Sequence, residues 1–219
     1  VGSPLQADQK LQDLKNETLQ LLGCTQTEAI KPLWDLFDQD YFLRNSPDVL
    51  AWHTTQLLQR QVSDLPLVDA RLDSDSSTVR FFICSPDSEK LLCDVTAGFD
   101  RLNMNIVDAR VHRMRSNLVI MVFVVLNSDR RAPSASDLTN AVDRLRVQLL
   151  DPTTSPSRGR ARIPRTLKHF PIETVVRFSE SATGDTTVME VIAQDRPGLL
   201  LGVAKALLSC KIRLVNAKV

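Results

Sequence analysis

A short loop near the end of the chain has the residue types best suited to binding a small anion. It reads Asp195-Arg196-Pro197-Gly198 and joins a predicted strand, residues 186–193, to a predicted helix, residues 199–209. Asp195 can accept a hydrogen bond from the Gly198 N–H, and Pro197 stands in a first turn, where no donor is needed. Gly198 allows another group to approach closely, and free N–H groups at a helix start suit a carboxylate. The same residues make a good helix start, so residue types alone support a binding loop and a plain helix start equally.

Residues suited to metal binding or catalysis are sparse elsewhere. None of the three histidines stands beside an aspartate or in an HExxH frame, which excludes a His-Asp metal centre built from this chain. Two Asp-x-Asp pairs are interpreted as solvated turns, because neither follows a Gly-Ser turn: Asp38/Asp40 and Asp73/Asp75. His53 is predicted to be a structural, partly buried side chain, and His112 to be solvated on the polar face of a strand. No metal ligand and no catalytic residue is predicted.

Composition excludes several classes of protein. The 219 residues carry a formal net charge of +1, whereas a nucleic-acid binder usually has a clear basic excess. The longest apolar run, Leu118 to Leu126, is far shorter than the roughly 20 residues that span a bilayer. The four cysteines lie far apart, which favours buried thiols in a reducing compartment. We therefore expect a cytoplasmic protein that binds neither nucleic acid nor membranes.

The loop has to be positioned by the elements around it, and apolar spacing predicts an α+β chain. Residues 1–66 are predicted to be a helical segment, with Gly23 ending the first helix and a second helix expected over 27–37. Ser46-Pro47-Asp48 is a strong start for a third helix. Residues 67–77 are predicted to be a linker.

A first unit of order β-α-β-β-α-β is predicted over residues 78–179. Leu118 to Leu126 is expected to be its central strand, and Ser134 with Asp137 resembles a capping box before its second helix. Glu173 to Phe178 is expected to be its closing strand. Residues 153–169 contain five basic side chains and no acidic one. They are interpreted as a solvated loop, with contact to an acidic partner as the alternative.

The pattern of the first unit recurs later in the chain. Residues 105–111 align without a gap with residues 213–219, and Leu91, Leu92 and Val95 match Leu199, Leu200 and Val203 at the same offset. Such agreement over two elements indicates a duplicated unit. We expect the second copy, residues 185–219, to be incomplete and to cover its apolar face on the sheet of the first unit or on another copy of the chain, as a homodimer.

These features resemble a known family. Asp195-Arg196-Pro197-Gly198-Leu199-Leu200, at the first strand-to-helix loop of a βαββαβ unit, is similar to the ACT domain, a regulatory amino-acid-binding module with a ferredoxin-like, two-layer fold. The stretches 33–35, 40–44 and 51–53 resemble the C-terminal part of bacterial PII uridylyltransferase/uridylyl-removing enzymes. The resemblance implies a glutamine-sensing region that acts with the PII signal protein and with upstream catalytic domains, which use magnesium. Those domains are expected before Val1.

The candidate ligand-binding residues are Asp195, Arg196, Gly198, Leu199 and Asn216. For Asn216, a contact with a neighbouring unit and plain surface solvation are equally supported. The first unit has Lys90 where the second has Gly198, so it is expected to support its neighbour rather than bind glutamine itself. Two alternatives remain: a free-standing protein of ACT repeats that binds amino acids or dimerises, and a structural tail of a hydrolase domain.

Overall fold

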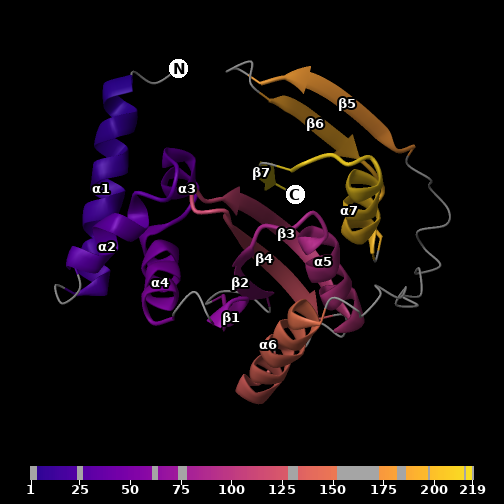
Figure 1. The fold of residues 1–219 in the computed structure, drawn as a ribbon, viewed down its shortest axis with the longest axis horizontal. Coiled ribbons are helices and arrows are strands. Elements are labelled where there is room, and N and C mark those ends of the chain that lie inside the picture. Colours follow the sequence, from indigo (N-terminus) through magenta and orange to yellow (C-terminus); the bar gives the residue numbers. More distant parts are fainter. Residues whose placement is uncertain are drawn as a thin grey trace.

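The computed structural model describes residues 4–23, 27–60, 64–73, 78–127, 133–151, 173–181, 186–196, 198–214 and 216–218. The chain combines a helical segment with antiparallel sheets, as the α+β prediction required (Figure 1). None of the described helices is both long and apolar enough to cross a membrane.

The described residues of the helical segment form four helices. They are α1 (Pro4–Leu22), α2 (Thr27–Trp34), α3 (Gln39–Leu43) and α4 (Pro47–Leu58). Gly23 has a φ of 69°, the left-handed conformation that ends α1 as predicted. The second helix ends three residues before the expected Phe37, because Asp38 accepts from the Tyr41 N–H and begins a separate short helix.

A five-stranded antiparallel sheet follows, in the order β1-β2-β4-β3-β7. Its strands are β1 (Leu67–Leu72), β2 (Thr78–Pro86), β3 (Met104–Arg113), β4 (Leu118–Asn127) and β7 (Asn216–Lys218). The apolar strand β4 is central, as predicted. Helices α5 (Leu91–Arg101) and α6 (Ala135–Leu150) follow β2 and β4, and α6 begins with the predicted Ser134–Asp137 capping box.

Two strands differ from the prediction. Residues 67–77 do not simply link the two parts, because β1 forms the edge strand beside β2 and buries Leu67 and Val68. The expectation that Glu173 to Phe178 closes the first unit is wrong, because β5 (Val175–Glu180) pairs with β6 (Thr187–Ile192) in a separate two-stranded sheet. In the first sheet, β1 fills the place beside β2 that a closing strand would take, so β5 has no position there.

The repeat explains this arrangement. Strand β5 begins 108 residues after β1, and α7 (Leu199–Ser209) begins 108 residues after α5, with equal lengths in both pairs. The pairing registers repeat as well, since Leu67 opposes Cys84 and Val175 opposes Ile192. The duplicated unit therefore starts at β1 and β5, earlier than the strand from which the sequence pattern was recognised.

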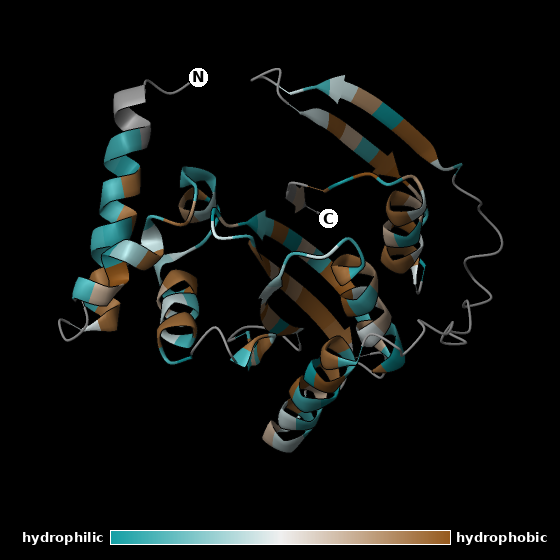
Figure 2. Cartoon of the chain, in the orientation of Figure 1, coloured by the Kyte–Doolittle hydropathy of each residue, from teal (hydrophilic) through white to brown (hydrophobic). Residues whose placement is uncertain are grey.

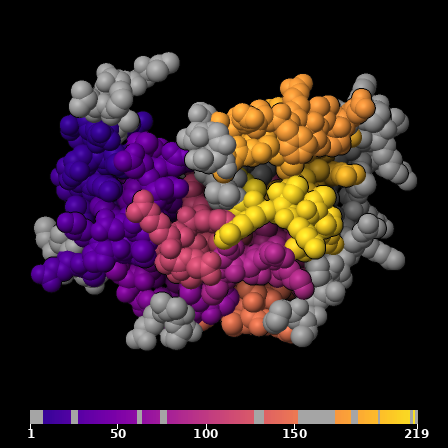
Figure 3. Space-filling view, turned by 45° about the horizontal axis from the view of Figure 1, so that its top comes forward, coloured from indigo at the N-terminus to yellow at the C-terminus, as the bar shows by residue number. Residues whose placement is uncertain are grey.

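The two copies meet across an approximate two-fold axis. Strand β7 pairs antiparallel with β3, and Arg110 of β3 opposes Lys218, its own counterpart in the repeat. Helix α7 packs beside its counterpart α5. Figure 3 shows the second copy, in orange and yellow, lying over the magenta first copy. The expectation that the second copy adds a strand to the first sheet is confirmed for β7.

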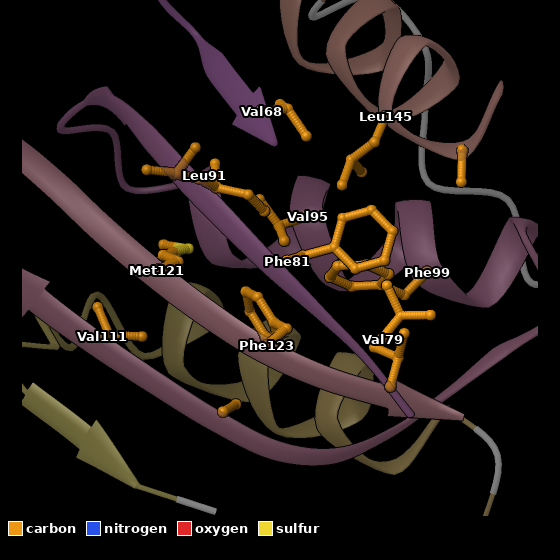
Figure 4. Packing of buried hydrophobic residues seen from close by; sticks show 14 of the residues in the cluster. Val68, Val79, Phe81, Leu91, Val95, Phe99, Val111, Met121, Phe123 and Leu145 are labelled. Carbon is orange, nitrogen blue, oxygen red and sulfur yellow. The ribbon is translucent and has the colours of Figure 1, made fainter. Parts of the chain in front are cut away.

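Both faces of the first sheet are covered. On one face, the rings of Phe81, Phe99 and Phe123 pack with neighbouring centroids 5.0 Å apart beneath α5 and α6 (Figure 4). On the other, residues of the helical segment such as Phe42 pack against Phe82 and its neighbours. The helical segment thus adds a third layer to the two-layer unit. His112 lies beneath it and is 3% exposed, so the prediction that it is solvated is wrong.

One irregularity changes the inward face of β3. The register against β4 shifts between Ile106 and Asp108, so Val107 stands in a bulge and is exposed. Ala109 and Val111, beyond the bulge, are buried.

The β5–β6 hairpin has no such cover among the described residues. Val176, Phe178 and Val188 are exposed, whereas the strands β1 and β2 in the first copy are largely buried. Figure 2 shows the brown, apolar segments along both strands of the hairpin.

Candidate functional site

The loop singled out from the sequence lies at the start of α7. Asp195, Arg196 and Gly198 are exposed, and Leu199 is half-buried as the first residue of the helix. Gly198 is the N-cap with a φ of 74°, a left-handed conformation that glycine adopts without strain. Among the described residues, no hydrogen bond joins Asp195 to the Gly198 N–H, so the expected cap is not formed.

The structure brings this loop toward the other copy. A side chain at Gly198 would lie 3.7 Å from the carboxylate of Asp100, in α5. Asn216 belongs to β7, where its backbone opposes His112, while its side chain and Pro197 lie outside the described residues. The role of these loop residues in ligand binding therefore stays a prediction.

The structure has a cavity at the corresponding loop of the first copy. It measures about 240 Å³ and lies between the β2–α5 loop and the end of α7 with the residues that follow it. Its apolar wall includes Leu92, Val111, Met121, Leu207 and Ile212. Both copies of the repeat therefore contribute to one cavity.

Charged groups of both signs line this cavity. Asp87, which is the counterpart of Asp195, pairs with Arg113 of β3 and with Arg213, whose Nη2 lies 3.0 Å from its carboxylate. Glu89 and Lys211 stand at the same cavity. A ligand with a positive and a negative group would find partners for both within one small volume.

The two arginines differ in their surroundings. The side chain of Arg113 is 20% exposed, and it also donates from Nε to the carbonyl of Leu214. Its burial, with a smaller contribution from the nearby charge of Arg213, lowers the pKa of Arg113 from its usual value. The side chain of Arg213 is 71% exposed and is joined to the first copy through Asp87. Arg113 is therefore the more enclosed of the two cations, and Arg213 is the more exposed one.

Sequence reasoning pointed to the second copy's loop and missed this cavity. It connects residues more than 120 positions apart, such as Asp87 and Arg213, so no local pattern marks it. The signal available was the alignment of Asp87 with Asp195. Lys90, on whose account the first unit is not expected to bind glutamine, precedes α5 in a right-handed conformation and does not line the cavity.

The remaining candidates for chemistry have structural roles. Asp38 caps α3, Asp40 pairs with Arg44, and Asp73 pairs with Arg80. Within the described residues, no three His, Cys, Asp or Glu side chains converge to hold a metal ion. Residues 153–169 and Asp75 lie outside the described part of the chain.

Two of the three described cysteines are buried, as expected. Cys84 and Cys93 are buried, and burial raises the pKa of Cys84 to about 12. Cys210 is exposed, which differs from the expectation, and Cys24 lies outside the described residues.

His53 is held by a hydrogen bond at the interface of helical segment and sheet. The Tyr41 hydroxyl lies 2.7 Å from its Nδ1, and its ring stacks on Phe82 with centroids 4.2 Å apart. Burial lowers the pKa of His53 well below its usual value and raises the pKa of Tyr41. His53 is therefore a buried structural residue, as predicted.

Comparison with known proteins finds relatives of the chain. Residues 6–56 match the family described as uridylyltransferase GlnD fifth domain. The bifunctional uridylyltransferase/uridylyl-removing enzyme of Methylococcus capsulatus is 34% identical over 92% of this chain and 23% of its own length. Those of Vibrio cholerae and Ectopseudomonas mendocina are 35% and 30% identical, over 88% and 99% of this chain and 22% and 25% of their own lengths. No solved structure matches the chain.

The chain thus spans about a quarter of the length of these curated relatives. The similarity covers both the helical segment and the repeated units, because the alignment with the Ectopseudomonas enzyme extends over 99% of the chain. The chain is therefore a member of the bifunctional uridylyltransferase/uridylyl-removing enzyme family and corresponds to a segment of those larger enzymes.

Proposed function

We propose that this chain is the glutamine-sensing regulatory region of a cytoplasmic enzyme that adds uridylyl groups to the PII signal protein and removes them. The repeated βαβ elements joined around a two-fold axis support this proposal, as does the similarity to the ACT domain in the Asp195–Leu200 loop. The names of the relatives support the activity of the whole protein.

The cavity at the junction of the two copies is the observation that carries the proposal. A free amino acid presents an ammonium and a carboxylate on one carbon, and it therefore needs a cation and an anion a few ångströms apart. Asp87 and Glu89 provide negative charge, and Arg113, Lys211 and Arg213 provide positive charge. The apolar wall suits the methylene groups of a glutamine side chain, and Ser88 offers a hydroxyl.

A ligand bound there would contact both copies at once. Its carboxylate would compete with Asp87 for the two arginines, and its ammonium would compete with the arginines for Asp87. Binding would therefore change how the second copy is held on the first, which is what a regulatory ligand has to do.

Calorimetric titration of the 219-residue chain with glutamine tests the proposal, with glutamate and asparagine as comparison ligands. Arg213→Ala removes an exposed cation of the cavity and should weaken glutamine binding about 10-fold or more, the scale of one charge-assisted bond. Arg177→Ala is the matched control, because Arg177 is similarly exposed and pairs with Glu190 on the hairpin. Absence of glutamine binding, or equal loss in both variants, would contradict the proposal.

A further inference from the structure

Successive residues of β3 face two different parts of the molecule. Val111 and Arg113 line the cavity between the two copies. His112 faces the other side, where the ring of Tyr41 packs edge-on against it with centroids 5.2 Å apart. Arg110 is oriented to the same side, and its Nη1 donates to the carbonyl of Arg44 at 2.5 Å. One short stretch of strand therefore contacts the cavity and the helical segment.

The backbone continues this contact beyond the strand. The N–H of Arg115 donates to the carbonyl of Leu36 at 3.1 Å, and Met114 is buried in the cluster beneath the helices. Tyr41 and His112 are 2% and 3% exposed. A buried, closely packed interface responds to displacement by repacking, because it cannot deform continuously.

The second copy is attached at the same place. Strand β7 pairs with β3 at Arg110, Val111 and His112, and Arg113 donates to the carbonyl of Leu214 just before β7. A change in the position of the second copy relative to the first would therefore displace the β3 residues that contact α3.

Building on the proposed function, we propose that β3 transmits occupancy of the cavity to the helical segment, with Arg110 and His112 as positioning residues. A ligand that takes Arg113 from Asp87 shifts the end of β3 and the β7 pairing together. His112 and Arg110 pass the shift to Tyr41 and to the backbone at Arg44. The helical segment is then the part of the chain through which glutamine changes the attached enzyme.

The chain carries a built-in probe for this inference. Both of its tryptophans, Trp34 and Trp52, lie in the helical segment, and neither lines the cavity. Titration with glutamine should change tryptophan emission with the same dissociation constant that calorimetry measures. Arg110→Met should leave that constant within about 3-fold and reduce the emission change by half or more. Arg115→Met is the matched control, because its side chain is exposed, and it should keep the full response.

The outcomes separate this inference from the proposed function. Glutamine binding without any change in emission, or with an equal change in Arg110→Met, overturns transmission through β3 and leaves the sensor intact. Absence of binding overturns the sensor.

A ligand-free measurement tests the transmission in either case. Asp87→Asn breaks the ion pairs of the cavity and should change the hydrogen-exchange rates of the Arg44 and Asn45 amides about 10-fold, and the double variant Asp87→Asn/Arg110→Met should lose that change. Unchanged exchange at both amides in Asp87→Asn overturns transmission.

Discussion

Arg110 opposes Lys218 across the junction of β3 and β7, and the two residues occupy the same position in the two copies of the repeat. The two-fold axis therefore passes between them, and each loop that precedes α5 or α7 faces the other copy. Asp87 forms ion pairs across this junction, whereas Asp195 is exposed. The two equivalent loops thus provide one cavity with charged walls and one open loop.

The two glycines at the start of α7 are expected to respond differently to the same substitution. Gly198→Ala should lower the free energy of unfolding by about 1 kcal/mol, because an L-residue is strained at a φ of 74°. Gly202→Ala should raise it by about 0.5 kcal/mol or more, because a methyl group there meets no atom within 4 Å and alanine favours helix. Urea denaturation of both variants measures the difference, and equal effects would contradict a left-handed conformation at Gly198.

Acid should destabilise the chain through His112. Burial lowers its pKa to about 4, with smaller effects from the charges of Asp38, Arg44, Arg110 and Asp40. The unfolded state, with a pKa of about 6.5, binds the proton first. The stability conferred by the neutral ring is therefore complete above about pH 6.5 and declines as the pH falls toward 4. The loss through His112 should reach about 3 kcal/mol at most. Burial of His53 adds to the loss in the same direction.

His112→Phe separates this effect from general acid unfolding. Neither ring nitrogen of His112 has a hydrogen-bond partner among the described residues, so phenylalanine loses no bond there. Urea denaturation between pH 7 and pH 4.5 should show a shallower decline for the variant than for the wild-type chain. If the free energy of unfolding declines equally with pH in both proteins, the pKa of His112 is not lowered in the folded state.

The β5–β6 hairpin should make the isolated chain self-associate. Phe178 is 65% exposed and lies on one face with Val176 and Met189, the counterparts of residues that are covered by helices in the first copy. Light scattering should show a mass that rises with concentration, and Phe178→Ser should reduce it. Val147→Ser is the control, because Val147 is a similarly exposed residue on α6. A strict monomer at all concentrations would contradict this prediction.

The sequence predicted elements well where the signal is local. The apolar run of β4, the capping box at Ser134 and the stop at Gly23 all specify their structure within a few residues. The repeat was recognised because α5 and β3 kept their residue types in the second copy. Its first strand was missed, because β1 follows Pro66 and precedes an Asp/Ser-rich stretch that indicates a linker.

Long-range pairing was not visible in the sequence. His112 alternates with buried residues as a surface side chain would, and its burial depends on helices some 70 residues earlier. Strand propensity could not predict the partner of β5. The last strand of the first unit and the first strand of the second unit require the same residue types. The charged cavity depends on the docking of two copies, which no single motif encodes.

Mapping of glutamine binding by backbone amide chemical shifts tests the central claim most directly. The chain, labelled with ¹⁵N, is titrated with glutamine, and the residues whose amide signals move are identified. The account predicts the largest shifts at Asp87 to Leu92 and at Lys211 to Leu214, the two walls of the cavity. Shifts confined to Gln194 to Leu199, or no shifts at millimolar glutamine, would contradict it.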